Sequence, residues 1–433
     1  AAWDWRFCFL IALSTLVDFQ VARAMFATND ARRRRALLGA SLAVNLGALG
    51  YFKYANFFAE SFCELFLLLG FEVPSFALDV VLPVGISFYT FQTLSYTVDV
   101  YRKTLEPTPN FFDFALFVAF FPQLVAGPIE RASRLLPQIT QPRALSWQRV
   151  NSGGWLIFWG LFKKVVVADN LGKMVDLVYA SGSSPTSAEL LLATYAFTFQ
   201  IYCDFSGYTD IARGVARLMG FELMLNFRLP FFARNPADLW RRWHISLSTW
   251  MRDYLYVSLG GNRAGSLITL RNLALTMVLS GLWHGAAMPF VLWGAYHALL
   301  LIVHRLCTPW LKPFGESGGA RQPLFYAASI LVMFHLTCLG FMIFRAESVG
   351  AIAGYLGLFT GPFELGVAAS WLLPMAVLVL PLMAMQVAQA MSDDLEVVLR
   401  WPPIVRVGVY LVLGFMIVLL GEDGGQPFIY FQF

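Results

Sequence analysis

The chain has 433 residues, of which 58% are hydrophobic and 13% are charged, and its formal net charge is +4. Soluble domains carry about 25% charged residues, so this composition excludes a soluble globular protein. Apolar runs of about 20 residues, the length that crosses a bilayer core of about 30 Å, recur along the whole chain. We therefore predict an all-α, polytopic membrane protein with about 11 transmembrane helices in a single domain over residues 1–433.

The predicted transmembrane runs follow one another from the beginning of the sequence to its last helix. They are residues 5–26, 36–58, 80–101, 111–127, 150–168, 188–205, 266–283, 285–306, 324–345, 368–390 and 402–420. Two shorter apolar pieces, 62–70 and 349–360, are expected to be re-entrant or interfacial. The first run lacks a basic n-region and contains Asp18, so it is not a signal peptide. We expect an upstream first membrane segment to be missing.

Lysine and arginine in short loops predict how the chain is oriented in the membrane. The loop at 27–36 and the stretch 130–149 are rich in arginine, which predicts that both lie in the cytoplasm. After Arg406 the chain has no Lys or Arg, and the tail 421–433 contains two acidic residues. The tail is therefore expected on the outer face. The sequence shows no internal repeat, which disfavours a transporter built from inverted repeats.

The segment 227–263 is basic and amphipathic rather than uniformly apolar. Asn235 and Pro236 provide an N-cap and a first helical residue. Large apolar side chains then fall on one face of a helical wheel, namely Leu239, Trp243, Leu247, Trp250 and Tyr254. This pattern predicts one helix lying in the cytoplasmic interface, with its Trp and Tyr side chains at headgroup depth.

Two interpretations of this segment stay open. An interfacial anchor, attracted to anionic membrane lipid, would explain the charges. Alternatively, arginines hold the phosphates of a nucleotide-derived acyl donor, because their forked donors suit phosphate; the candidates are Arg241, Arg242, Arg252 and Arg263. His244 favours the functional interpretation, since an anchor has no need of a histidine beside its apolar face.

His284 has the most unusual setting of the five histidines. It lies deep in apolar sequence between Gly281 and Gly285, and an ionisable group at membrane depth normally faces a water-filled cavity or pathway. Pro289 predicts that one helix ends here and another begins. A neutral imidazole is a common general base near neutral pH, so we predict a catalytic His284; the alternative is a structural histidine that bridges helices.

The remaining polar candidates are weaker. His297, His304 and His335 are interpreted as packing residues, because no carboxylate or cysteine joins them at metal-ligand spacing, and no metal site is predicted. In "YCDFSGYTD", Asp204 and Ser206 are expected to line a cavity. Serine-hydrolase, P-loop and zinc-protease motifs are absent from the sequence.

Several long motifs occur together in one order. They are "LPVGISFYTFQTLSYTVDVYR", "FFPQLVAGPIERA", "LFKKVVVADNL", "CDFSGYTDIA", "WRRWHISLSTWMRDYLY", "LGGNR" and "GLWHGA". With this order and spacing, the chain resembles the membrane-bound O-acyltransferase (MBOAT) family over essentially its whole length. Within that family it is most similar to the bacterial alginate O-acetyltransferase branch.

The resemblance implies a helical bundle around a central tunnel that narrows at the catalytic histidine. It implies that His284 is the catalytic histidine, that His244 is a second one, and that Trp283, Asp204 and Ser206 line the tunnel. It further implies transfer of acetyl groups from cytoplasmic acetyl-CoA, with no permanently bound cofactor, across a bacterial inner membrane to a periplasmic, alginate-like polysaccharide. A periplasmic esterase-like partner is expected, and no nucleic acid.

Two alternatives to this function remain. Peptidoglycan O-acetylation would use the same core motifs on another polymer. A transporter of a lipid-linked sugar would instead use the ionisable residues of the apolar runs as its pathway, namely Asp18, Lys53, Asp99 and Asp169.

The chain ends in "PFIYFQF", an aromatic tail that follows the last predicted helix. Gly424, Gly425 and Pro427 can turn the chain back toward the bundle. In one interpretation the tail only docks in a groove or at the outer interface, where aromatic side chains are favoured. In the other, Tyr430 is an acyl carrier that receives the acetyl group with the help of His284, as the resemblance to tails of related acyl-transfer systems implies.

Overall fold

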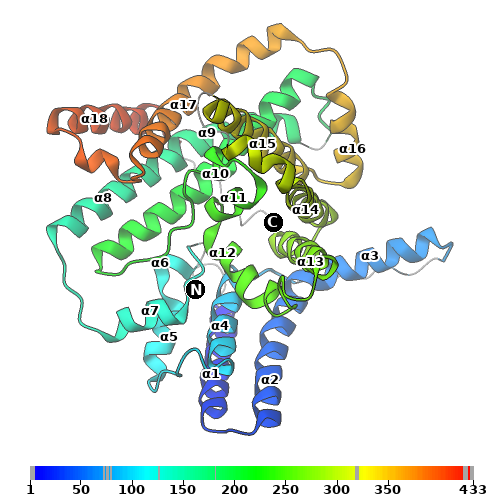
Figure 1. Cartoon of the computed structure of the whole chain (residues 1–433), viewed down its shortest axis with the longest axis vertical. Coiled ribbons are helices and arrows are strands. Elements are labelled where there is room, and N and C mark those ends of the chain that lie inside the picture. The colour runs from blue at the N-terminus through cyan, green and yellow to red at the C-terminus, as the bar shows by residue number, and fades with distance from the viewer. Residues whose placement is uncertain are drawn as a thin grey trace. The chain divides into compact units, whose positions relative to one another are not determined.

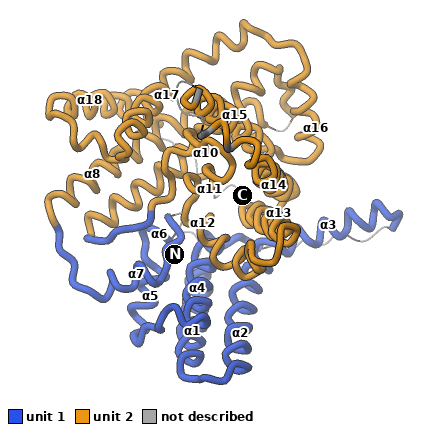
Figure 2. The backbone as a smooth tube through the Cα atoms, in the orientation of Figure 1, with its two compact units in different colours: residues 1–145, 220–224 blue, residues 146–219, 225–433 orange. Residues whose placement is uncertain are grey.

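A computed structural model describes residues 5–71, 74, 78, 80–124, 127–180, 182–316, 321–422 and 428–429. These residues form helices and connections, with no strand among them. They pack as two compact units (Figure 2). Unit 1 consists of residues 1–145 and 220–224, and unit 2 consists of residues 146–219 and 225–433.

Unit 1 is built around a group of three packed helices, α1, α2 and α4 (Figure 1). Its helices are α1 (Phe7–Phe26), α2 (Ala31–Leu49), α3 (Ala55–Leu68), α4 (Ile86–Tyr101), α5 (Phe111–Ala119), α6 (Phe121–Leu124) and α7 (Ala132–Thr140). A π turn at Gly50–Tyr54 joins α2 to α3. The predicted run 36–58 and the predicted re-entrant piece 62–70 therefore belong to one continuous helix.

Asp18 of α1 is a buried carboxylate with partners on α2. The Ser41 hydroxyl donates to Asp18 Oδ1 at 2.5 Å, and the Asn45 side-chain amide donates to Asp18 Oδ2 at 2.9 Å. A buried carboxylate requires such donors, because an unpaired one is strongly disfavoured away from water. Asp18 thus connects two helices of unit 1.

Unit 2 is arranged around α10, a helix of 32 residues that packs against α8, α9, α15 and α17 (Figure 1). Its helices are α8 (Trp147–Leu161), α9 (Asp169–Tyr179), α10 (Ser187–Leu218), α11 (Pro236–Arg242), α12 (Ile245–Trp250), α13 (Ser266–His284), α14 (Met288–Glu316), α15 (Arg321–Arg345), α16 (Val349–Leu358), α17 (Leu365–Ser392) and α18 (Pro403–Leu420), with π turns at Phe162–Ala168 and Met251–Tyr256 and 3₁₀ turns at Pro230–Phe232 and Val397–Arg400. The π turn at Phe162–Ala168 joins α8 directly to α9.

Among the described residues, seven helices are long and apolar enough to cross a membrane. They are Phe7–Phe26, Ala31–Leu68, Ser266–His284, Met288–Leu311, Gln322–Arg345, Leu365–Ser392 and Pro403–Leu420. The other four predicted runs, 80–101, 111–127, 150–168 and 188–205, are also helical over most of their length but are shorter or less apolar. The chain is an all-helical, multi-pass membrane protein.

The backbones of α8 and α10 approach each other at two pairs of glycines. A Cβ atom on Gly160 would lie 2.6 Å from the carbonyl oxygen of Gly207, and one on Gly207 would lie 2.8 Å from the carbonyl oxygen of Gly160. Gly153 and Gly214 face each other in the same way, seven residues away on each helix. Only glycine permits this approach, because any side chain would meet the opposing backbone.

We predict that Gly160→Ala destabilises the protein by about 1–3 kcal/mol, because the added methyl group separates α8 from α10. Gly154→Ala is the matched control. A Cβ atom at Gly154 meets no atom within 4 Å, so this change should be neutral or stabilising through helix propensity. Thermal unfolding of the detergent-solubilised protein measures both, and equal melting temperatures for the two variants would contradict the prediction.

Candidate active site

The amphipathic segment 227–263 is not the single helix that the wheel pattern predicts. The predicted cap is present, since the Asn235 side chain accepts a hydrogen bond from the Asp238 backbone at 2.8 Å and Pro236 follows it. However, α11 ends at Arg242, Trp243 is extended, and His244 has a left-handed backbone with φ of 41°. The prediction of one continuous helix is therefore wrong.

The apolar side chains of this segment also face protein rather than lipid headgroups. Four of the five predicted stripe residues are buried, namely Leu239, Trp243, Leu247 and Trp250. Trp243 and Trp250 are buried inside unit 2, whereas the place of the segment at the cytoplasmic interface stays a prediction. The segment contributes to the core of this unit.

Asn226 accounts for the break in the helix at His244. Its side-chain oxygen accepts hydrogen bonds from the Ser246 backbone N–H at 3.2 Å and from the Ser246 hydroxyl at 2.9 Å. The carbonyl oxygen of Asn226 accepts from the Ile245 N–H at 2.9 Å. These bonds replace the intrahelical partners that a continuous helix would supply, and Asn226 itself is almost fully buried.

The same amide determines which nitrogen of His244 carries a proton. A backbone N–H can only donate, so the Asn226 atom that faces Ser246 must be its oxygen. That oxygen lies 3.1 Å from His244 Nδ1. Because an amide oxygen can only accept, Nδ1 is the protonated nitrogen, and the lone pair of the neutral ring is on Nε2.

His244 has no contact with bulk solvent, since its side chain is 0% exposed. Burial lowers the pKa of His244 to about 3, because the charged imidazolium is disfavoured away from water. The Phe205 ring packs edge-on against it, with the ring centres 4.7 Å apart. His244 is therefore a neutral imidazole at physiological pH.

His284 lies where one helix ends and the next begins, as Pro289 predicts. It is the last residue of α13, and α14 begins at Met288. The two helices are close enough that a Cβ atom on Gly281 would lie 2.1 Å from the Phe290 carbonyl oxygen, and one on Gly294 would lie 2.4 Å from the Met277 carbonyl oxygen. This tight pairing fixes the position of the His284 backbone.

The structure brings the two histidines together inside a shell of aromatic rings. The ring centres of His244 and His284 are 6.3 Å apart. Trp283 contacts both, at 6.0 Å from His244 and 5.0 Å from His284. Trp293 and Phe344 cover the other side of His284, at 5.1 and 5.5 Å. Two buried imidazoles in a water-poor setting are suited to moving a proton between reacting groups.

His297 has the packing role that the sequence analysis assigns to it. It is 2% exposed, and its ring packs against Trp293 at 4.7 Å and Trp240 at 5.1 Å. Trp293 thus separates His297 from His284. His335 is exposed, and its Nδ1 lies 2.8 Å from the Leu331 carbonyl oxygen in the same helix.

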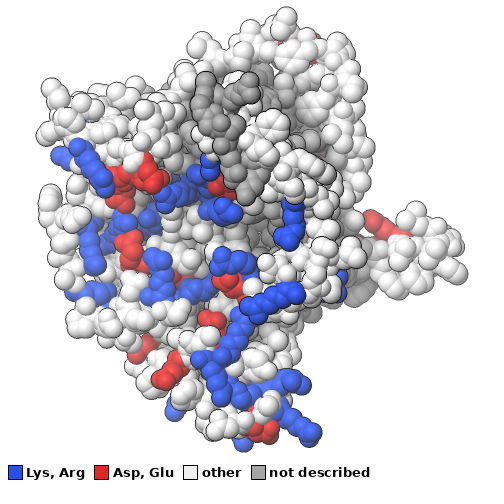
Figure 3. Space-filling model, in the orientation of Figure 1, with Lys and Arg blue, Asp and Glu red and all other residues white. Residues whose placement is uncertain are grey.

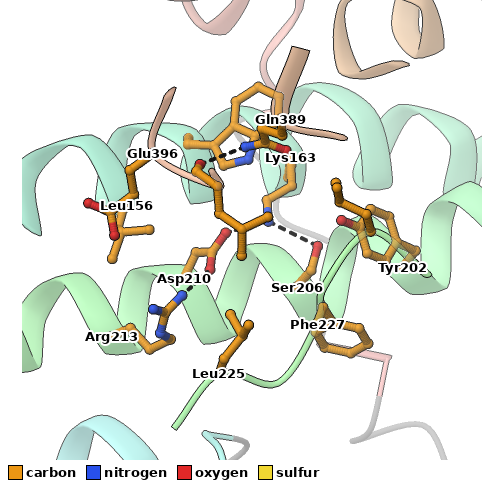
Figure 4. Close-up of a pocket in the computed structure, with 13 residues that line it drawn as sticks. Leu156, Lys163, Tyr202, Ser206, Asp210, Arg213, Leu225, Phe227, Gln389 and Glu396 are labelled. Carbon is orange, nitrogen blue, oxygen red and sulfur yellow. Dashed lines mark hydrogen bonds and ion pairs between the residues drawn. The ribbon is translucent and has the colours of Figure 1, made fainter. Parts of the chain in front are cut away.

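A polar cleft lies between α8, the π turn at Phe162–Ala168, α10 and the stretch 225–229 (Figure 4). Lys163 crosses it, donating to the Ser206 hydroxyl at 3.0 Å and pairing with Asp210 at 2.6 Å. Arg213 pairs with the other oxygen of Asp210 at 3.3 Å. Phe227 lines the cleft and also stacks with His244 at 6.5 Å. Phe227 therefore lies between the cleft and His244.

The four candidate donor-binding arginines divide into two kinds. Arg242 pairs with Asp238 at 3.0 Å, and Arg252 pairs with Asp253 at 2.7 Å. Arg241 and Arg263 are exposed, and no ion pair joins either of them to another described residue. Figure 3 shows basic and acidic side chains lying next to one another on the visible face of unit 2.

The three predicted lining residues occupy three different places. Ser206 lines the cleft, and Trp283 packs beside both histidines. Asp204 is buried in an ion pair with Lys164, with 2.5 Å between Oδ1 and Nζ. Tyr430 lies outside the described residues. Ile429, which precedes it, is buried, and its N–H donates to Asp204 Oδ2 at 2.7 Å.

Sequence reasoning missed Asn226, Lys163 and Lys164. The lysines could have been found from the sequence, because "LFKK" places two adjacent charges in an apolar run. Ionisable groups within a membrane-spanning run usually have a function or a partner. Asn226 left no comparable signal, since its partners are 18 and 20 residues away. Its importance depends on tertiary contacts.

Comparison with known proteins identifies the family. The family model for the membrane-bound O-acyltransferase family matches residues 93–344. The probable alginate O-acetylase AlgI of Pseudomonas putida is 41% identical over 362 residues, which are 82% of this chain and 71% of that protein. AlgI of Pseudomonas aeruginosa is 41% identical over 355 residues, 80% of this chain and 65% of that protein.

A protein that acts on another polymer is also similar. The peptidoglycan O-acetyltransferase of Helicobacter pylori is 35% identical over 375 residues, 81% of this chain and 69% of that protein. The chain thus spans roughly two thirds of the length of these relatives. This similarity supports the enzyme over the transporter alternative, and two of the residues proposed for a transport pathway, Asp18 and Asp169, have structural partners. The chain belongs to the membrane-bound O-acyltransferase family and is an acyltransferase.

Proposed function

We propose that this protein moves acetyl groups from cytoplasmic acetyl-CoA across the bacterial inner membrane for O-acetylation of a periplasmic, alginate-like polysaccharide. The observation that carries the proposal is the buried pair His244 and His284, which lies within the part of the chain that matches the acyltransferase family. The 41% identity to alginate O-acetylases supports an alginate-like polymer. Peptidoglycan is the second candidate, because of the 35% identity to a peptidoglycan O-acetyltransferase.

The proposed reaction is transfer of acetyl from a thioester to a hydroxyl group. The hydroxyl oxygen attacks the thioester carbonyl carbon, a C–O bond forms and the C–S bond breaks. His284 takes the hydroxyl proton as general base and returns it to the departing thiolate, so the products are an acetyl ester and free CoA thiol. His244, kept neutral by burial, supports this proton transfer through the lone pair on Nε2.

For donor binding, we assign the phosphates of acetyl-CoA mainly to Arg241 and Arg263. Both side chains are exposed and neither has an ion-pair partner among the described residues, so both can bind phosphate without breaking a contact. Arg242 and Arg252 are already paired with carboxylates. Their contribution would be to the positive potential around the donor rather than to direct contacts.

On the acceptor side, we propose that Tyr430 first receives the acetyl group and that a periplasmic esterase-like partner passes it to the polymer. A phenol has a pKa near 10, so its oxygen is a better leaving group than an aliphatic alkoxide. The observation in favour is that the chain returns to the bundle just before Tyr430, where Phe428 packs against Phe205, which also contacts His244.

We predict that His284→Gln lowers acetyl transfer by about 10²–10⁴-fold, because a positioned general base contributes that much to the rate. The measurement is transfer of labelled acetyl from acetyl-CoA in membranes that contain equal amounts of each protein. His335→Gln is the control, since His335 is an exposed histidine on α15. A well-expressed His284→Gln protein with near-normal transfer would exclude the proposed role.

We also predict that the double variant Arg241→Gln/Arg263→Gln raises the KM for acetyl-CoA about tenfold and changes kcat less, since exposed charges contribute to binding before the chemical step. Arg32→Gln/Arg33→Gln removes the same charge from exposed arginines of α2 and serves as the control. Equal KM values for the two double variants would refute donor binding by Arg241 and Arg263 and favour the interfacial anchor.

A further inference from the structure

Two residues of the C-terminal tail, Phe428 and Ile429, lie in the core of unit 2. Phe428 and Ile429 are 7% and 3% exposed. The Phe428 ring packs against Phe205 and Tyr208, with ring centres 5.8 and 5.0 Å apart. The Ile429 N–H donates to Asp204 Oδ2 at 2.7 Å, across 225 residues of sequence. The tail is therefore held by one directional bond as well as by apolar packing.

The side chain of Asp204 is fixed by an ion pair with Lys164, which also pairs with Asp169. Lys164 Nζ lies 2.5 Å from Asp204 Oδ1 and 2.8 Å from Asp169 Oδ1. The lysine occupies one carboxylate oxygen of Asp204, and the tail backbone occupies the other. A hydrogen bond to an ionised acceptor is about twice as strong as a neutral one. Asp204 is only 3% exposed, so losing the tail would remove one of its few donors.

The attachment point lies next to the histidine pair. Phe205 follows Asp204 in α10 and contacts both the tail, through Phe428, and His244, whose ring centre is 4.7 Å away. A single ring therefore separates the seated tail from His244.

We propose that Asp204, supported by Lys164, is a positioning residue that seats the C-terminal tail beside the histidine pair, and that this seating is required for rapid acetyl transfer. The inference rests on the proposed function for its second part only. The ligand is the chain's own tail, recognised through the backbone N–H at position 429. Because Asp204 accepts from the backbone, binding of the tail requires an N–H group at position 429, whereas the identity of the side chain there matters less.

The test removes the same hydrogen bond from each side. Asp204→Leu removes the acceptor, and Ile429→Pro removes the N–H donor with no substitution in the helices. Hydrogen exchange of the tail amides, measured by mass spectrometry on the full-length protein in detergent, reports seating independently of activity. Both variants should speed exchange in the tail about tenfold or more, and should lower kcat about tenfold or more with little change in the KM for acetyl-CoA.

Three control variants make the result specific. Ile429→Val keeps the N–H and should behave as wild type. Asp210→Asn removes another α10 carboxylate, which pairs with Lys163 instead of the tail, and should leave tail exchange unchanged. Tyr430→Phe should keep slow exchange while losing transfer, if the hydroxyl is the acetyl acceptor.

Unchanged tail exchange in Asp204→Leu or Ile429→Pro would overturn the proposal, as would faster exchange with undiminished transfer. Asp204→Asn retains an oxygen acceptor and guards against misfolding of the leucine variant; its tail exchange should lie between those of wild type and Ile429→Pro. If the wild-type protein transfers no acetyl group, the proposed function fails, whereas the exchange data still decide whether Asp204 seats the tail.

Discussion

The hydrogen bonds of the Asn226 side chain are the constraint from which the rest of the site follows. One buried amide oxygen holds the Ser246 backbone, the Ser246 hydroxyl and His244 Nδ1. Together with the backbone bond to Ile245, it stabilises the left-handed conformation of His244, which costs a non-glycine residue free energy. The turn directs the imidazole into the core of unit 2 and leaves its lone pair on Nε2.

The close approach of α13 and α14 positions His284, the second histidine of the site. The α13–α14 pair meets at Gly281, one turn before His284 in α13, and at Gly294 of α14. This hairpin presents His284 at a helix end instead of in the middle of a helix. Aromatic rings then fill the space around both imidazoles. The result is a low-dielectric setting in which the imidazolium form of His244 is disfavoured and proton transfer is not lost to bulk water.

Local signals in the sequence were sufficient for much of this account. Apolar runs predict the helices, and Pro289 predicts the break at His284. The prediction of one helix over 227–263 was wrong, because periodicity shows which side chains are apolar but not where the backbone leaves the helix. Here the helix ends because Asn226 binds the backbone and side chain of Ser246. The glycines and proline before Phe428 predict that the tail turns back, and the structure describes Phe428 and Ile429 packed against α10. Asp204 as their partner could not be predicted, because the contact joins residues 225 positions apart.

The central claim is that Asn226 holds His244 as a neutral imidazole with its lone pair on Nε2, next to His284. The most direct test is the pH dependence of kcat/KM for acetyl transfer in Asn226→Asp and Asn226→Leu. Aspartate keeps an oxygen acceptor but adds a negative charge that favours imidazolium, so the pKa of His244 rises, and the acid limb of the profile should move up by about 1–3 pH units. Leucine removes the acceptor, so the rate should fall at every pH, by about 10–100-fold. A wild-type rate and pH profile in both variants would contradict the account.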